Sequence, residues 1–261
     1  MEVSLVHPGP ASRELLLLQG NHRSSQIWDG QCLSQTFRPR CLDDMWEFIK
    51  DHPLHPRIVR RLEGTDFYRI IEIDQLKFDW ALIERWRPET HTFHIPIGEA
   101  TITLEDVKVL FVLPVDGILV SYPHALRDYT GVDYLHMLQR LTGFQPAEPT
   151  ALSGVSRLQL RPVRQHFVAM GVEIMDDSPP EDIDRHTRLL MLLMFGGILF
   201  PNTSGNLANL RFLHNLEWLD DLSGYSWGAA ILGYLYRQMC RACMSTQRDV
   251  AGFLPLLQVK T

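Results

Sequence analysis

The sequence is poor in cysteine. Its 261 residues include only four, Cys32, Cys41, Cys240 and Cys243. So few cysteines do not form the disulfide framework that holds small secreted domains together, and we expect a reducing, intracellular setting. Cys240 and Cys243 make a C-x-x-C pair, but they lie at the end of a long predicted helix. A thioredoxin-like site needs this motif at a helix start, so we interpret the pair as buried structural thiols.

Long apolar runs are also missing. The longest, LLMLLMFGGILF at 189–200, is shorter than the ~20 residues that cross a bilayer as a helix. It predicts a buried core helix, and we expect no membrane partner. The N-terminal MEVSLVHPGP lacks the charged and apolar regions of a signal peptide.

Lysine is scarce, with 4 lysines against 21 arginines, and the net charge is −6 with histidine neutral. This charge gives no overall attraction to nucleic acid or anionic membranes. Arginine binds carboxylates bidentately and stacks on rings, which favours ion-paired surfaces or interfaces. Codon bias explains the arginine excess equally well.

Motifs that bind phosphate-bearing cofactors are absent, since neither GxxxxGK[ST] nor GxGxxG occurs. Lys50, Lys77 and Lys108 lack the context of a pyridoxal-phosphate lysine, and Lys260 is nearly terminal. The tripeptide GNH at 20–22 matches one block of metallophosphatases, but the GDxHG and GDxxDRG blocks that complete a two-metal site are missing. We therefore expect no cofactor and no metal.

Helical periodicity covers most of the chain from Leu42 onward. Helices are predicted at about 45–52, 54–63, 75–86, 104–113, 134–143, 161–171, 183–200, 206–220 and 226–244. Between 92 and 103 the pattern changes to apolar alternation interrupted by a turn, which predicts an antiparallel β-hairpin. We thus predict a mainly α chain, with an irregular N-terminal arm at 1–40 and a single helical domain at 41–261 that contains this small hairpin.

The pentapeptide GYSWG at 224–228 matches the G-x-S-x-G nucleophile elbow of α/β-hydrolases. That fold needs a strand before the serine and a histidine after it. The preceding segment is helical in period, and the last histidine, His214, precedes Ser226. We interpret Ser226 as a helix N-cap whose hydroxyl accepts a backbone N–H, with Ala229 and Gly233 giving a small face for close packing. A hydrolase remains the weakest of our functional alternatives.

Charged and aromatic residues are densest in ERWRPETHTFHIPIGEATITLEDV at 84–107. His91 and His94 would diverge across a strand, because side chains alternate between its faces, so joint metal binding is not expected. We predict an ion-paired surface where the helix meets the hairpin, and Thr103 with Asp106 capping the next helix. No catalytic residue is predicted. The candidate docking residues are Trp80, Glu84, Arg85, Trp86, Arg87, Glu89, His91, His94, Glu99 and Trp227.

Several blocks, in order along the chain, resemble the plant mobile domain family, and in particular its maintenance-of-meristems-like branch. Members of that branch are often named serine/threonine-protein phosphatase 7 long form homolog. The matching blocks are HPGP (7–10), HRSSQIWDGQ (22–31), FDWALIERWRPETHTFHIPIGEATITLEDV (78–107), LPVDG (113–117), LRPVRQHF (160–167), LLMLLMFGGILFPNTSG (189–205), YSWGAAILGYLYRQMCRA (225–242) and GFLPLLQ (252–258).

The resemblance implies a transposon-derived, non-enzymatic interaction module in the nucleus. It implies action with a phosphoprotein-phosphatase-7-like partner in transposon silencing, gene expression and meristem maintenance. The alternative is direct binding of chromatin or nucleic acid inherited from a transposon, with 92–112 as part of a winged-helix-like unit. The net charge disfavours this alternative, whereas a contiguous arginine-rich face would favour it.

Two departures from the family pattern generate expectations. Val112 stands where the family has glycine before LPVDG, and a β-branched residue strains a glycine-type helix cap. The family also continues beyond LLQ, so the chain resembles a form truncated at its C-terminus. We therefore expect 226–244 and 253–257 to expose apolar surface that a missing segment would cover.

Overall fold

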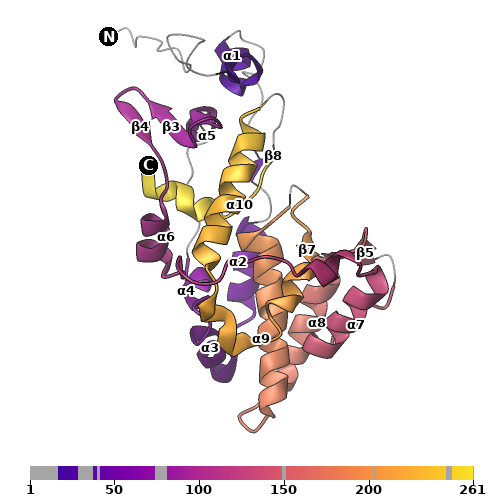
Figure 1. Ribbon diagram of the computed structural model, residues 1–261. Coiled ribbons are helices and arrows are strands. Elements are labelled where there is room, and N and C mark those ends of the chain that lie inside the picture. Colours follow the sequence, from indigo (N-terminus) through magenta and orange to yellow (C-terminus); the bar gives the residue numbers. More distant parts are fainter. Residues whose placement is uncertain are drawn as a thin grey trace.

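The computed structural model describes residues 17–28, 38–39, 42–73, 81–148, 151–202, 204–244 and 249–260. Most of these residues lie in helices (Figure 1). Their strands form one two-stranded and two three-stranded sheets, all small. The mainly α prediction is confirmed. None of the helices in these ranges is both long and apolar enough to cross a bilayer.

Helix α9 (Pro180–Met194) lies at the centre of the packing. It begins with a proline at its first position and two acidic residues in its first turn, both favourable at a helix N-terminus. It continues as a π-helical turn, η4 (Phe195–Leu199). The side chains from 189 to 195 are fully buried, as predicted for a core helix.

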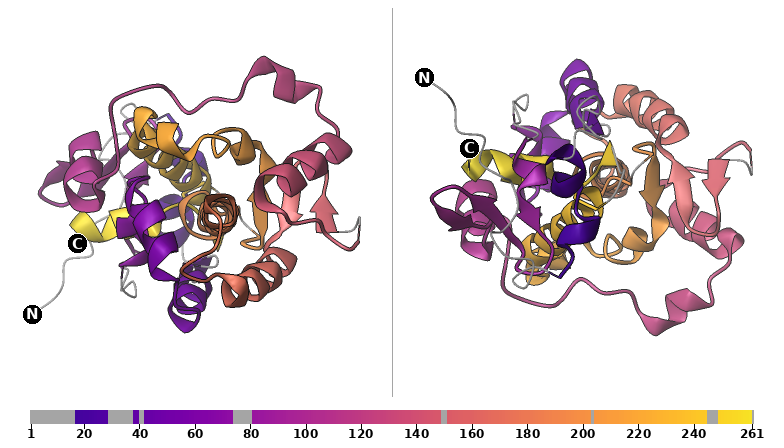
Figure 2. Two further views of the ribbon diagram at one scale, coloured as in Figure 1. Left: turned by 90° about the horizontal axis from the view of Figure 1, so that it is seen from below. Right: turned by 90° about the horizontal axis from the view of Figure 1, so that it is seen from above.

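Three helices pack on α9: α3 (Pro56–Glu63), α7 (Gly131–Thr142) and α8 (Leu160–Glu173). Figure 2 shows α9 nearly end-on, with these helices around it. The remaining helical segments of the first half are α2 (Leu42–Asp51), α4 (Tyr68–Ile71), α5 (Ala81–Glu84), α6 (Leu104–Phe111) and η2 (His124–Arg127). In the described part of predicted helix 75–86, α5 ends at Glu84, and Trp86 lies in a strand instead.

The second long helix, α10 (Trp227–Ala242), packs against α6. Gly228 allows the approach, because a Cβ there would lie 2.8 Å from Val115 Cγ1. Nothing lies within 4 Å of a Cβ built at Gly233. The predicted small face of Ala229 and Gly233 is therefore wrong, and the close contact falls one turn earlier along the helix.

The C-terminal apolar segment is buried. Phe253, Leu254, Leu256 and Leu257, from η7 (Leu254–Lys260) and the residue before it, are at most 1% exposed. The Phe253 ring packs edge-on to Phe111 at 5.0 Å. Among the described residues of 226–244 and 253–257 no large apolar side chain is exposed, so the expectation of uncovered apolar surface there is wrong.

The predicted hairpin is confirmed. Strands β3 (Thr92–Ile95) and β4 (Gly98–Ala100) pair antiparallel, with Phe93 opposite Ala100. A further strand, β2 (Trp86–Arg87), extends the sheet on the other side of β3. The sheet is short because prolines at 88 and 96 interrupt the extended segments.

A second sheet was not predicted. It consists of β5 (Leu152–Ser153), β6 (Arg157–Gln159) and β7 (Leu207–Asn209), all antiparallel. The helix predicted at 206–220 is wrong, because β7 is followed by two 3₁₀ segments, η5 (Leu210–His214) and η6 (Leu219–Gly224). Tertiary packing decides the outcome: a Cβ at Gly196 would lie only 2.8 Å from Ala208, so β7 rests directly on the π turn.

The N-terminal arm is not wholly irregular. Its described residues form η1 (Gln19–Asn21) and α1 (Arg23–Trp28). Strand β1 (Arg38–Pro39) pairs in parallel with β8 (Asp249–Val250) near the other end of the chain. The rest of 1–40 lies outside the described residues.

Both ends of α6 follow the sequence expectation. Thr103 and Asp106 form a reciprocal capping box, in which Thr103 Oγ1 accepts the Asp106 N–H and the Asp106 carboxylate accepts the Thr103 N–H. The helix ends at Val112, which adopts the left-handed conformation with φ 55° and ψ 25°. Such a conformation costs a β-branched residue roughly 1–2 kcal/mol, so the predicted strain is present.

We expect Val112→Gly to raise the free energy of unfolding by about 1 kcal/mol, because glycine adopts this conformation without the steric penalty. Urea unfolding followed by circular dichroism measures the change. The matched control is Val109→Gly, an exposed position inside the same helix, which should lower stability by about 0.5 kcal/mol. A loss of stability in both variants would contradict the strain at Val112.

Candidate functional site

The two described tryptophans among the predicted docking residues are core residues. Trp86 is fully buried; its Nε1 donates to Cys240 Sγ at 3.3 Å, and its ring packs on Tyr236. Trp227 is fully buried, and its Nε1 donates to the Leu222 carbonyl at 2.9 Å. Trp80 lies outside the described residues. The buried tryptophans therefore position the site rather than form its surface.

Arg87 is 1% exposed, so its predicted place on an ion-paired surface is wrong. Its Nη1 donates to Ser24 Oγ at 3.3 Å, across from helix α1. Burial lowers the pKa of Arg87, with Glu89 acting against that effect. Strand β2 thus turns Arg87 inward, where it fastens the N-terminal arm to the hairpin sheet.

His22 completes this buried polar cluster. Its Nε2 lies 2.7 Å from the Trp86 carbonyl, which only accepts, so Nε2 carries the proton. Its Nδ1 is then the acceptor, 3.1 Å from the Ser24 N–H and 2.8 Å from Ser24 Oγ. Hydrogen bonds consequently run in one direction, from Arg87 to Ser24 to His22 and on to Trp86.

This arrangement requires a neutral imidazole. Burial, followed by the nearby Arg87 cation, lowers the pKa of His22 to about 4. A second proton on Nδ1 would face the Ser24 N–H and lie beside Arg87, so protonation breaks the chain of hydrogen bonds. The cluster His22–Ser24–Arg87 therefore stabilises the contact between the N-terminal arm and the hairpin sheet.

The carboxylates of the block also face the arm. Glu89 Oε1 accepts the Leu18 N–H at 2.8 Å, and Glu84 Oε1 lies 3.9 Å from Arg23 Nε. Arg85 Nη1 donates to the His94 carbonyl at 3.5 Å, within its own sheet. The predicted ion-paired surface is therefore replaced by contacts that hold residues 17–28 against the hairpin.

His91 and His94 engage different partners. His91 lies in the turn before β3, at φ 54°, and its ring stacks on Tyr236 with centroids 5.4 Å apart. His94 Nε2 lies 3.2 Å from Glu99 Oε1 on the facing strand. The assignment of His91 to the strand is thus wrong, because the turn that starts at Pro88 includes His91 and the strand begins at Thr92.

Ser226 stands at the N-cap of α10, but its hydroxyl makes no capping bond. Instead Oγ donates to the Val115 carbonyl at 2.6 Å and ties α10 to the loop after α6. The predicted position is confirmed and the predicted bond is wrong. The segment before Ser226 is the 3₁₀ helix η6 and not the strand of a nucleophile elbow.

Cys240 and Cys243 are free thiols near Trp86 and the arm. Cys243 is fully buried, and burial raises its pKa to about 12. Burial also raises the pKa of the half-buried Cys240. The predicted burial is confirmed for Cys243, whereas Cys240 is only half-buried, and Cys32 and Cys41 lie outside the described residues.

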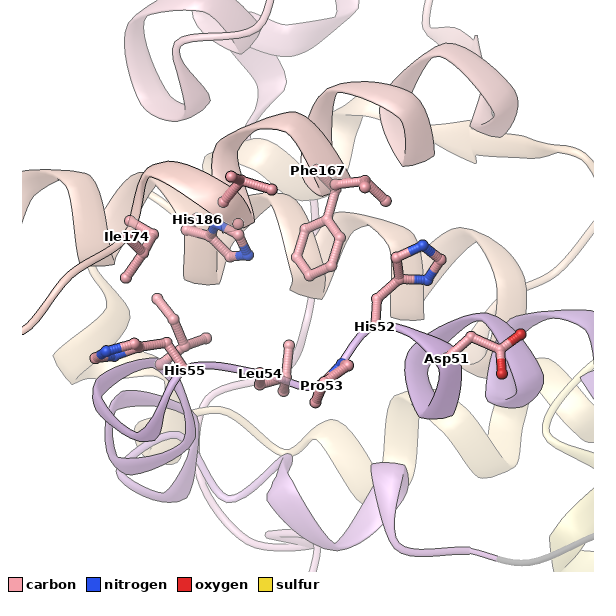
Figure 3. A pocket seen from close by; sticks show the side chains of 12 residues that line it. Asp51, His52, Pro53, Leu54, His55, Phe167, Ile174 and His186 are labelled. Carbon is pink, nitrogen blue, oxygen red and sulfur yellow. The ribbon is translucent and has the colours of Figure 1, made fainter.

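A separate cavity of about 220 Å³ lies between α8, α9 and the loop from α2 to α3 (Figure 3). His52 and His55 reach it from the loop, and His186 from α9. The His186 ring lies 4.3 Å from the Phe167 ring, and burial lowers its pKa to about 4. Sequence reasoning missed this cavity because nothing in the spacing links residue 52 to residue 186.

The described residues contain no group of three or more His, Cys, Asp or Glu side chains placed to hold a metal. Two of the cavity histidines have other partners: His52 Nδ1 bonds the Phe48 carbonyl at 2.8 Å, and His55 Nδ1 accepts the Arg57 N–H as the cap of α3. His186 Nδ1 is buried without a hydrogen-bond partner and packs on Phe167. The cavity is thus lined by rings that stabilise neighbouring helices.

The sequence model of the family described as "Plant mobile domain" matches residues 66–261. This span includes the hairpin sheet, α9 and α10.

The chain belongs to the plant mobile domain family.

Its curated relatives include three proteins of Arabidopsis thaliana. "Serine/threonine-protein phosphatase 7 long form homolog" is 34% identical, with 97% of this chain and 18% of the relative aligned. "Protein MAIN-LIKE 2" is 33% identical, covering 97% and 36%. "Protein MAINTENANCE OF MERISTEMS" is 34% identical, covering 94% and 49%. This plant mobile domain thus spans at most about half the length of these relatives. No solved structure matches it.

We expect this plant mobile domain to lose stability as the pH falls from 6.5 to 4. In that range a histidine of the unfolded chain binds a proton that buried His186 does not bind. Proton binding therefore stabilises the unfolded state relative to the folded state. At pH 5 the cost is about 2 kcal/mol for one such residue. His186→Leu should abolish that share while changing stability at pH 7 by less than about 1 kcal/mol.

Urea unfolding at several pH values tests this expectation. His136→Leu, at an exposed position of α7, is the matched control and should keep the wild-type pH profile. An unchanged acid sensitivity in His186→Leu would show that His186 is not held neutral in the folded state.

Proposed function

We propose that this plant mobile domain is a non-enzymatic interaction module. It docks a phosphatase-7-like protein in the nucleus and acts in transposon silencing, gene expression and meristem maintenance. The names of its relatives support this proposal, since one is called a phosphatase 7 homolog and another maintenance of meristems. The partner, the compartment and the process are extensions from those names.

One surface feature carries the docking proposal. Seven exposed apolar side chains belong to the hairpin turn, α6 and the following loop; they are Ile97, Leu104, Val109, Leu110, Val112, Ile118 and Leu119. We call this set the 97–119 face. The hairpin and α6 lie on one side of the molecule (Figure 1). Apolar side chains grouped on a surface are typical of protein interaction sites.

Two observations support the non-enzymatic part. The hydroxyl of Ser226 is engaged by the Val115 carbonyl, so it has no free role as a nucleophile in this arrangement. Arg87, from the charged stretch 84–107, is buried together with His22 and Arg23, and these residues hold the arm. Catalytic groups, in contrast, lie in clefts where they reach a substrate.

A charge placed in the 97–119 face should disrupt docking. We expect Ile97→Asp with Val109→Asp to weaken capture of a plant phosphatase-7-like protein by at least about tenfold, because apolar anchors dominate binding energy. Biolayer interferometry with the purified partner measures the affinity. Val155→Asp with Val172→Asp adds the same charge at exposed sites elsewhere and should leave it unchanged.

Equal affinities of the two double variants would refute the 97–119 face, and no binding by the wild-type chain would refute the named partner. A fluorescent fusion expressed in plant cells tests the compartment. Exclusion of that fusion from the nucleus would overturn the nuclear assignment.

A further inference from the structure

An arginine-lined cleft of about 480 Å³ lies between α10, the β6–β7 strands and the 3₁₀ segment η5. Its cationic residues are Arg157, Arg211, Arg237 and Arg241. Arg237 and Arg241 stand four residues apart and so share one face of α10. In Figure 1 β7, which carries lining residues of the cleft, and α6 lie on opposite sides of α10.

Among the described residues, no neighbouring side chain neutralises these four charges. No carboxylate is among the described residues that line the cleft. Within the described ranges, none of these four arginines has a carboxylate within salt-bridge distance. This grouping contrasts with Arg61, which pairs with Asp184 at 2.7 Å and with Asp220 at 2.5 Å.

The guanidinium groups converge. Arg241, Arg237 and Arg157 all counteract the rise in the pKa of Tyr234 that burial causes. Arg211 approaches from the other wall, where it lies over the Tyr122 ring at 5.7 Å, and its Nε is buried without a hydrogen-bond partner. Side chains from three elements thus direct positive charge into one concavity.

Flat rings and amides complete the lining. Phe200 and Phe212 stack with centroids 4.6 Å apart, and Tyr122 packs edge-on to Phe212. The amides of Asn202 and Gln238 also reach the cleft. Positive charge beside aromatic rings is the combination that binds single-stranded nucleic acid, with arginines on phosphates, rings against bases and amides on base edges.

We propose that this cleft binds a short single-stranded segment of nucleic acid. Its volume suits one or two nucleotides, whereas a duplex is too wide to enter a concavity of this size. A phosphorylated side chain brings negative charge but no base, so it would leave the rings and amides of the lining without a partner. The local charge acts despite the net charge of −6, because each guanidinium lies within a Debye length of the ligand.

Fluorescence anisotropy with labelled twelve-nucleotide oligo(dT) and oligo(U) tests the proposal on the full chain. Arg237→Gln with Arg241→Gln should weaken binding by about tenfold or more, because two charge-assisted contacts are lost. The slope of log affinity against log salt should fall by about 1.4, at ~0.7 for each phosphate contact. Both side chains are exposed, so the variant should retain the wild-type melting curve.

The matched control is Arg60→Gln with Arg69→Gln, which removes the same charge at exposed sites on α3 and α4. It should bind within about twofold of the wild type. Equal losses of oligonucleotide affinity in the two variants would show that binding depends only on overall charge, and would overturn the proposal. Binding of a labelled phosphoserine peptide without binding of either oligonucleotide would also overturn it, as would binding of neither.

This inference is independent of the proposed docking function. The cleft and the 97–119 face lie on different sides of α10, so the cleft variant should capture a phosphatase-7-like protein as the wild type does. No capture by the wild-type chain, together with oligonucleotide binding that the cleft variant loses, would count against docking alone.

Discussion

The burial of α9 is the constraint on which the rest of the fold depends. From Leu189 onward the helix is apolar on all sides and must be covered on all sides, and its neighbours come from distant parts of the chain. Glycines make this possible where the helix passes into its π turn. A Cβ at Gly197 would lie 2.6 Å from Met45 Cε, and one at Gly196 would meet β7. Helix α2 and the second sheet can therefore approach the core only because these positions lack side chains.

The charged segment 84–107 contacts the N-terminal arm and holds residues 17–28 in place. A hydrogen-bond chain with one direction of donation, through His22 and Ser24, has a single consistent protonation pattern. That requirement explains why an arginine and a histidine are buried together without a carboxylate in the chain of bonds. The exposed functional candidates lie elsewhere, on α6 and in the arginine-lined cleft.

Features set by local chemistry could be predicted from the sequence. The Thr103 capping box, the hairpin, the core run at 189–200 and the strained cap at Val112 all depend on neighbouring residues. Features set by contacts between distant residues could not. The sheet of β5, β6 and β7 joins segments about fifty residues apart, and Arg87 is buried because α1 covers it. The cleft unites Arg157 with Arg237, which no spacing rule connects.

The N-terminal arm is fastened to segments near the other end of the chain. His22 bridges to Met244, the Arg23 N–H donates to the Cys243 carbonyl at 2.7 Å, and β1 pairs with β8. During synthesis on a ribosome, the arm emerges well before the segments with which it pairs. The hairpin, α9 and their neighbours can pack before the arm makes these contacts. Loop closure over such a separation is entropically costly, so we expect the arm to pair with residues 243–250 only after the helices have packed.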